Sequence, residues 1–446
     1  MKLQFGFARE CINPEVPVSL AGYFNRRMWD RVLDDIEVRA VVLERDGVWA
    51  ALVQLDLVTV TAEIRAGILD GLAAAGISQI GSDNLLVTAT HTHTAPEVRS
   101  GKPGSNPAYP PFAAARAVKA LRQALATLHP GEALQGKGFD ARFLFNRRYW
   151  MKNGVVLTNP GKLNPQIDRP EGATDPSIPL LAIRQEGFYR LLLANIVNHT
   201  DTIGGDYVSA DWPGRMEHEI QARLGYDVPV ITMIGAQGNI NHFNTATAAD
   251  QTSYLEATRI GKTYAAVILA ALYQLNEVKV KAIRAAVTTL EVPYVTVTDA
   301  EYAEARKTVE KFRDAVMEDG RDFTSEDIAK KHPFVLRFFA ENLMKCRDEA
   351  CKNKRVEKMV ALQFGDAIGV VSIPAEPFTE IGLGIKAASR FPLTLVAGLS
   401  MGEVGYVGLP EHYCHGGGYE TSPSPEKADR LAGQNMMNTA IELLNR

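Results

Sequence analysis

The stretch VWAALVQLDLVTV at residues 48–60 is a valine- and leucine-rich apolar run, which predicts a buried strand. The next residues, TAEIRAGILDGLAAA at 61–75, switch to helical spacing, with apolar side chains at Ile64, Ile68 and Leu72 before a glycine ends the pattern. NLLVTAT at 84–90 predicts a second strand. A strand, a helix and a strand in this order predict a right-handed crossover between two parallel strands of one sheet.

Hydrophobic periodicity continues the alternation of strands and helices along the rest of the chain. Further strands are predicted at 191–198, 228–235, 278–290, 292–297, 360–373 and 393–399. Further helices are predicted at 110–128, 253–274, 378–389 and 425–444, and the segment 134–179, with its glycines and prolines, is expected to be irregular. We therefore expect an α/β protein with mixed β-sheets and flanking helices.

The sequence shows no internal repeat and no low-complexity linker, and so we expect a single domain over residues 1–446. Residues 300–358 hold most of the lysine, glutamate and arginine density, with only sparse apolar anchors. This pattern predicts a charged helical insertion. Its helices either present a solvated surface or cover an active site as a lid.

The composition is that of an ordinary folded protein and argues against several classes of partner. Of the 446 residues, 46% are hydrophobic and 22% charged, as in soluble globular proteins. Lysine and arginine number 48 against 52 aspartates and glutamates, so the formal net charge is −4 and we expect no nucleic-acid partner. The longest apolar run, 264–273, is too short for a transmembrane segment. With no recognisable signal peptide and only four scattered cysteines, we expect a cytoplasmic protein.

Side chains that can bind a metal follow three of the predicted strands. His91 and His93 stand in THTHTAP, directly after the strand NLLVTA, and residues two apart in extended backbone point to the same face. His199 follows another predicted strand and Glu376 a third. Ligand sites of α/β sheets gather outside the carboxyl ends of strands, and imidazole and carboxylate are ligands that zinc prefers. The sequence therefore predicts a zinc site.

Two other motifs are weaker indicators of function. GLSMG at 398–402 matches the G-x-S-x-G nucleophile elbow, but the residues after it contain two further glycines and no helical pattern, so we do not expect a serine hydrolase. SADWPG at 209–214 either starts a helix, with Asp211 near its N-terminus, or supplies a carboxylate that orients a metal-binding histidine.

Several motifs in a fixed order point to a known family. They are GY at 22–23, DDIEVRA at 34–40, THTHTAP at 90–96 and SADWPG at 209–214. In these motifs the chain resembles the neutral/alkaline, non-lysosomal ceramidases, zinc amidohydrolases that cleave the N-acyl bond of ceramide. The resemblance runs through most of the chain and implies a ceramidase-like catalytic domain, without the family's immunoglobulin-like C-terminal domain.

The resemblance also implies roles for individual residues. The zinc ligands would be His91, His199, Glu376 and Tyr406, and the catalytic residues that position water and stabilise the oxyanion would be His93, Arg147 and Tyr419. A tyrosine ligand is unusual, because the ion must draw a phenol with a pKa of about 10 toward phenolate.

Asn241 marks a difference from the family. It stands in GNINHF at 238–243, where ceramidases have the serine that contacts the ceramide headgroup. An amide reaches further than a hydroxyl and presents a planar donor and acceptor. We therefore expect Asn241 to bind a substrate that is smaller or more polar than ceramide.

Together these observations predict a zinc-dependent amidohydrolase that cleaves an amide C–N bond of a small molecule with metal-activated water. Two alternatives stay open. The same zinc site could hydrolyse an ester or a lactone, because the metal does not itself distinguish acyl leaving groups. The chain could also be a non-catalytic metal-binding scaffold.

Overall fold

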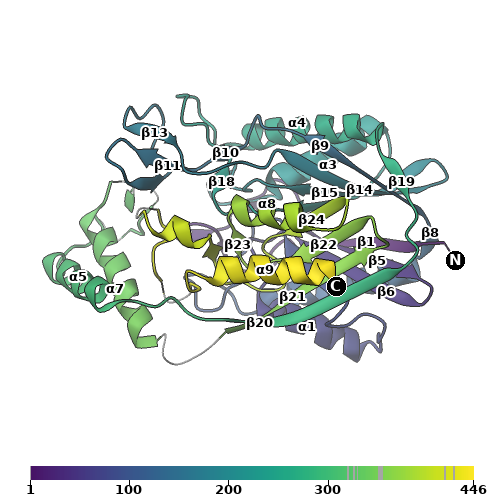
Figure 1. Cartoon of the computed structure of the whole chain (residues 1–446), viewed down its shortest axis with the longest axis horizontal. Coiled ribbons are helices and arrows are strands. Elements are labelled where there is room, and N and C mark those ends of the chain that lie inside the picture. Colours follow the sequence, from purple (N-terminus) through teal and green to yellow (C-terminus); the bar gives the residue numbers. More distant parts are fainter. Residues whose placement is uncertain are drawn as a thin grey trace.

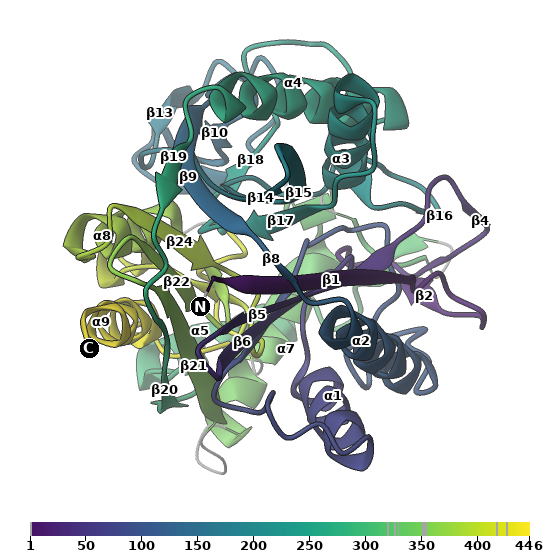
Figure 2. The same ribbon diagram turned by 90° about the vertical axis from the view of Figure 1, so that its right-hand side faces the viewer.

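Three large sheets, each covered by helices, make up most of the structure (Figures 1 and 2). The computed structural model describes residues 2–318, 321–324, 327–328, 330–349, 355–415, 418–424 and 427–446. Each of the three sheets contains both parallel and antiparallel strand pairs. This confirms the predicted α/β class with mixed β-sheets and flanking helices.

The first sheet contains the predicted strand-helix-strand unit. Its order is β7-β6-β5-β1-β8, with β1 (Gln4–Cys11), β5 (Glu37–Arg45), β6 (Val48–Leu55), β7 (Leu85–Ala89) and β8 (His129–Pro130). The parallel strands β6 and β7 are joined by α1 (Ala62–Ala74), whose N-terminus is capped by the Thr61 side chain. A second helix, α2 (Tyr109–Ala126), packs beside α1 and against β1 and β5.

The second sheet has the order β17-β15-β14-β9-β19. Its strands are β9 (Glu132–Phe139), β14 (Ser177–Gln185), β15 (Phe188–Ile196), β17 (Val230–Ile234) and β19 (Asn276–Val278). Its parallel pair, β15 and β17, flanks α3 (Asp211–Leu224), which packs against α4 (Tyr254–Leu272). β9 lies in the segment 134–179, so the expectation that this segment is irregular was wrong.

The third sheet has the order β20-β21-β22-β24. Its strands are β20 (Ile283–Val292), β21 (Arg355–Phe364), β22 (Ile368–Ser372) and β24 (Leu393–Ala397). The parallel strands β22 and β24 flank α8 (Thr379–Ala388), and α9 (Ala432–Asn445) packs against α8 and against β20, β21 and β22. The start of the predicted terminal helix, 425–426, lies outside the described residues.

Short strands and one 3-10 helix connect the sheets around the site described below. They are β2 (Ser19–Leu20), β3 (Arg27–Met28), β4 (Arg31–Val32), β10 (Phe145–Asn146), β11 (Arg148–Met151), β12 (Val156–Thr158), β13 (Ile167–Pro170), β16 (Tyr207–Val208), β18 (Ile240–Asn241), β23 (Glu376–Pro377), β25 (Tyr406–Val407) and η2 (Pro410–Tyr413).

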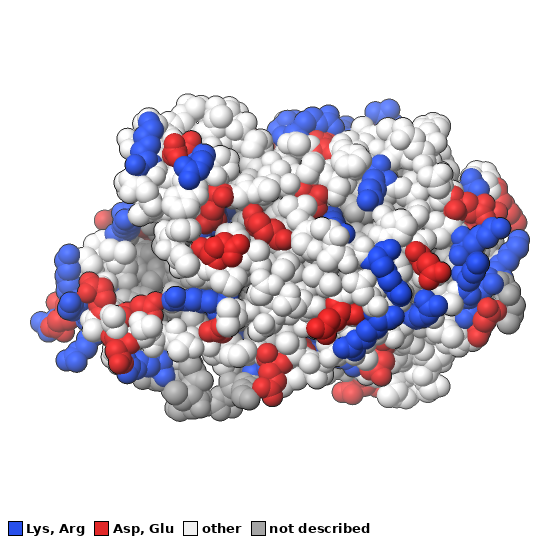
Figure 3. Space-filling view, in the orientation of Figure 1, with Lys and Arg blue, Asp and Glu red and all other residues white. Residues whose placement is uncertain are grey.

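The charged stretch after residue 298 includes, among its described residues, two long helices at one end of the molecule (Figure 1). These are α5 (Asp299–Lys311) and α7 (Pro333–Glu349), which pack against each other. Arg355 already belongs to β21, and residues 350–354 lie outside the described part of the chain. Figure 3 shows acidic and basic side chains mixed over the visible face, including this end. No helix in the described residues is long and apolar enough to cross a membrane.

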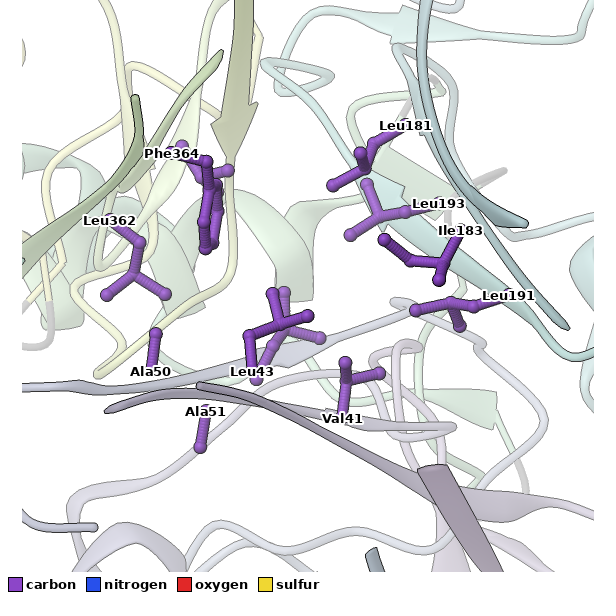
Figure 4. A pocket seen from close by; sticks show the side chains of 12 residues that line it. Val41, Leu43, Ala50, Ala51, Leu181, Ile183, Leu191, Leu193, Leu362 and Phe364 are labelled. Carbon is purple, nitrogen blue, oxygen red and sulfur yellow. The ribbon is translucent and has the colours of Figure 1, made fainter. Parts of the chain in front are cut away.

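The inner faces of the three sheets meet in a common apolar core. Backbone hydrogen bonds join the sheets, from Ala89 N to Leu399 O (3.1 Å) and from Gly398 N to Ile234 O (3.0 Å). Side chains from all three sheets point to one centre, where they line a cavity of about 20 Å³ (Figure 4). The cavity is too small for anything larger than about one water molecule.

Leu193 projects from β15 into this centre and is 5% exposed. We expect Leu193→Ala to lower the free energy of unfolding by about 2–5 kcal/mol, because truncation removes buried methyl groups and enlarges the cavity. Urea unfolding followed by circular dichroism measures the change. Val48→Ala, at a site 47% exposed on β6, is the control, with an expected change within about 0.5 kcal/mol. Equal effects of the two substitutions would contradict this account of the core.

Candidate metal centre

Each of the three sheets contributes one side chain to a buried cluster. His91 follows β7, His199 follows β15 and Glu376 follows β22, and all three of these strands belong to parallel pairs. The backbone of His91 has φ = 63°, a conformation that a non-glycine residue adopts at some energetic cost. The sheets thus bring together, at their carboxyl edges, residues that lie 285 positions apart in sequence (376 − 91).

The nitrogen and oxygen atoms of this cluster lie within a few ångströms of one another. Glu376 Oε2 is 3.1 Å from His91 Nε2 and 3.5 Å from His199 Nε2. His93 Nε2 is 3.2 Å from His91 Nε2. Each of the three buried histidines offers a ring nitrogen within 4.8 Å of the others, and this group could hold a metal ion.

Backbone carbonyls fix the orientation of two of the imidazoles. His91 Nδ1 lies 2.7 Å from Val58 O, and His199 Nδ1 lies 2.7 Å from Ile240 O. A carbonyl oxygen only accepts, so each Nδ1 carries a proton, and in the neutral form of each ring the Nε2 lone pair faces Glu376. Neither Nε2 makes a well-directed hydrogen bond to Glu376 Oε2, which is buried. Two ring nitrogens and a carboxylate oxygen that face one another form a donor set that could hold a metal ion, and the hydrogen bonds to Nδ1 are those found behind metal-binding histidines.

Burial and charge control the ionisation of these groups. Burial, followed by the charge of Arg147, lowers the pKa of His199 to about 4, so this ring is neutral at pH 7. Burial raises the pKa of Glu376, but the two facing imidazoles outweigh it and hold the pKa well below its usual value. For His91, burial lowers the pKa and the Glu376 carboxylate raises it more. The Glu376 carboxylate therefore favours a positively charged group in the space between the His91 and His199 rings.

Tyr406 is placed next to Glu376 by a short parallel strand pair. In the register of β23 and β25, Glu376 and Tyr406 are direct partners. Burial, then the charge of Glu376, raises the pKa of the Tyr406 phenol well above its ordinary value. The structure thus places the predicted tyrosine ligand beside the predicted carboxylate ligand.

Arg147 reaches the cluster between two tyrosine rings. Its guanidinium lies 5.1 Å from the ring centroid of Tyr406 and 5.3 Å from that of Tyr419. Nη2 donates to Gly238 O (2.8 Å), and Nη1 lies 3.1 Å from His199 Nε2. The two tyrosines and the arginine therefore form one wall beside the histidines.

His93 contacts a carboxylate that the sequence reasoning did not assign. Its Nδ1 is 3.4 Å from Asp201 Oδ1, and the Tyr23 hydroxyl donates to the same oxygen. A Cβ atom on Gly22 would lie 2.4 Å from the His93 ring, and the residue has φ = 92°, so this position requires glycine. Asp201 stands two residues after His199, and the i, i+2 spacing was the signal that could have identified it.

Asn241, the predicted substrate contact, lies on β18 and is buried. Its Nδ2 donates to Asn159 Oδ1 (3.0 Å), and its Oδ1 accepts from Phe243 N (3.1 Å). β18 pairs with β10, the strand that leads into Arg147, so Asn241 lies near the wall and already takes part in hydrogen bonds within the protein.

The other two motifs have structural roles. Asp211 is the first residue of α3 and accepts from Trp212 N (2.6 Å) and from Thr202 N (2.8 Å), so of the two interpretations of SADWPG the helix start is the one that these contacts favour. The Ser400 hydroxyl is buried and donates to Ala397 O (2.6 Å). It is therefore engaged by the backbone and does not project as a nucleophile.

Aromatic contacts place the charged helical segment at the edge of the site. The Phe24 ring centroid lies 5.1 Å from Phe323, 6.4 Å from Phe339 and 6.0 Å from Tyr419. Phe339 belongs to α7, and Tyr419 belongs to the wall beside Arg147. These rings connect the helices to the tyrosine wall.

The fold defined by the three sheets is that of the neutral ceramidases. A solved structure of a ceramidase complexed with C2 matches with a TM-score of 0.75 at 16% sequence identity, over 100% of this chain and 75% of that chain. The crystal structure of the neutral ceramidase from Pseudomonas aeruginosa matches with a TM-score of 0.74 at 16% identity, over 100% of this chain and 74% of that chain. A scan against protein-family models found no match, and neither did a search of the curated proteins. The structural likeness confirms the ceramidase-like fold that the sequence motifs predicted.

Proposed function

We propose that the chain is a zinc-dependent hydrolase that cleaves an amide C–N bond of a small molecule. The observation that carries the proposal is the convergence of His91 Nε2, His199 Nε2 and Glu376 Oε2 in a buried cluster beside the Arg147 guanidinium. The ceramidase fold supports an amide as the scissile bond, because the ceramidases of the resemblance are amidohydrolases.

His91, His199, Glu376 and Tyr406 would hold the zinc ion in this proposal. When bound, zinc polarises the scissile carbonyl and lowers the pKa of a bound water from 15.7 to about 7. Glu376 contributes the one carboxylate of the set, and its low pKa keeps it ionised at neutral pH. Tyr406 completes the set from the adjacent strand.

The remaining polar groups act on the substrate. Arg147 and Tyr419 donate to the carbonyl oxygen as negative charge develops on it. Hydrolysis removes one proton from water and delivers one to the leaving nitrogen. His93 Nε2, which faces His91, can carry this proton from the water to the nitrogen. Asp201 lies beside the His93 ring, with Oδ1 3.4 Å from Nδ1, and Asn241 would bind the polar end of the substrate.

An activity screen tests the proposal. The purified chain is incubated with short N-acyl anilides, the matching phenyl esters, lactones and ceramide, with and without a chelator. We expect hydrolysis of the anilides, its loss after chelation and its return on addition of zinc. Hydrolysis of the esters or lactones without any hydrolysis of the amides would contradict the assignment of an amide as the scissile bond. Zinc binding without turnover of any substrate would contradict catalysis and favour the scaffold.

A further inference from the structure

A buried carboxylate fixes the direction in which Arg147 points. Glu420 Oε1 lies 2.9 Å from Arg147 Nε, and Glu420 Oε2 lies 3.2 Å from Arg148 Nη1. The Glu420 side chain is 0% exposed, and the Thr158 hydroxyl also donates to it. A buried carboxylate needs such partners, because an unpaired charge in the interior is costly.

The contacts of Arg147 leave only one edge of its guanidinium for the metal centre. Nε and Glu420 Oε1 form an ion pair without a well-directed hydrogen bond, and Nη2 donates to Gly238 O. Because a guanidinium is planar and rigid, the ion pair with Glu420 and the hydrogen bond at Nη2 together constrain Nη1, which faces His199 Nε2 at 3.1 Å. Glu420 therefore orients the Arg147 guanidinium by contacting the side of it that faces away from His199.

Lys427 fixes the loop that carries both Glu420 and Tyr419. Its Nζ donates to the backbone oxygens of Ser422 (2.7 Å), Glu420 (3.2 Å) and Tyr419. An ammonium has three N–H donors, so these carbonyls satisfy it fully. Burial lowers the pKa of Lys427 to about 8.

A glycine allows the loop to approach the arginines. Gly418 has φ = 85°, and a Cβ atom there would lie 2.5 Å from Arg148 Nη1 and 2.5 Å from Thr158 Oγ1. The backbone of residue 418 thus packs directly against the partners of Glu420.

We propose that Glu420 and Lys427 are positioning residues, which hold Arg147 and Tyr419 in the geometry that the reaction needs. Glu420 acts on the guanidinium directly, and Lys427 acts by fixing the backbone of the loop. Neither contacts the predicted zinc ligands in the described structure, and so neither is needed for metal binding. This inference rests on the proposed function, because it assigns the role of Arg147 in that reaction.

A double-mutant cycle tests the role of Glu420. We expect Glu420→Gln to lower kcat on the best anilide substrate by about 10- to 100-fold, as for other groups that orient an active-site residue, with KM and zinc content nearly unchanged. In an Arg147→Ala background, Glu420→Gln should cause almost no further loss, because residues that act through one another are not additive. Equal losses in both backgrounds would overturn the proposal.

Two matched controls separate positioning from general stability. Glu217 is also a buried carboxylate between two arginines, 2.6 Å from Arg39 Nη2 and 3.5 Å from Arg9 Nη1, and Glu217→Gln should leave kcat unchanged. Lys427→Met should lower kcat, whereas Lys386→Met, which removes another buried lysine paired with Asp175 (2.7 Å), should not. Equal losses of kcat in the matched variants would show a general effect of buried charge and overturn the proposal.

Crystal structures of the wild type and of Glu420→Gln provide a measurement that does not depend on activity. We expect the Arg147 guanidinium to turn away from His199 in the variant, while His91, His199 and Glu376 keep their places. An unmoved Arg147 would overturn the positioning role even if the wild type hydrolysed none of the substrates, an outcome that would contradict only the proposed function.

Discussion

His199→Ala is expected to lose its zinc and to lower amide hydrolysis by a factor on the order of 10³ or more. Among the predicted ligands, this imidazole is the one that follows a strand of the second sheet, and its Nε2 lies 3.5 Å from Glu376 Oε2. A bound ion contributes several kcal/mol of charge stabilisation in the transition state, and each 1.36 kcal/mol is a factor of about ten in rate. Metal analysis of the dialysed protein and a kinetic assay on the same sample measure both effects. His91→Ala should behave in the same way.

The matched control is His218→Ala, which removes an exposed histidine from α3. It should keep one zinc ion per chain and full activity. Full zinc occupancy in both His91→Ala and His199→Ala would contradict the assignment of these residues as ligands.

Arg147→Ala is expected to keep its zinc and to lose about 10²- to 10³-fold in kcat. The guanidinium is directed at the cluster, and removal of one donor to a developing oxyanion costs about 3–4 kcal/mol in other enzymes. Arg147→Lys should recover little of the loss, because the single nitrogen of an ammonium cannot lie both beside Glu420 and beside His199 as Nε and Nη1 of the guanidinium do. The measurement is kcat and KM together with zinc content.

Arg142→Ala is the control for charge, since Arg142 lies five residues away, is exposed and pairs with Asp140 at 2.5 Å. Its kcat should equal that of the wild type. If Arg147→Ala also had unchanged turnover, the arginine would have no part in the reaction.

The sequence predicted correctly those helices and strands whose capping residues, hydrophobic spacing and terminating glycine all lie close together in the chain. The strand-helix-strand unit at 48–90 was predictable because α1 has a capping threonine, a helical stripe and a terminal glycine. β9 was missed because Gly136 and Gly138 interrupt its pattern. Cβ atoms at these positions would lie 2.6 Å from Leu275 and 2.8 Å from Val267, so glycine is required there by distant residues that pack against the strand.

The same distinction applies to the site. His91, His93, His199 and Glu376 were identifiable because each follows an apolar strand, and the carboxyl ends of strands are where ligands collect. Glu420 and Lys427 carry no such signal. The pairing of Glu420 with Arg148 joins residues 272 positions apart, and only the folded chain reveals it.

The origin of the ligands in three separate sheets has a consequence for biosynthesis. His91 and His199 leave the ribosome long before Glu376 and Tyr406, by which time the earlier strands β1 to β19 have all been made. A nascent chain commonly folds from its N-terminal part onward. The two histidines therefore stay without their predicted partners until residues 376–406 have been made, and a chain that ended before Glu376 would lack two of the four predicted ligands.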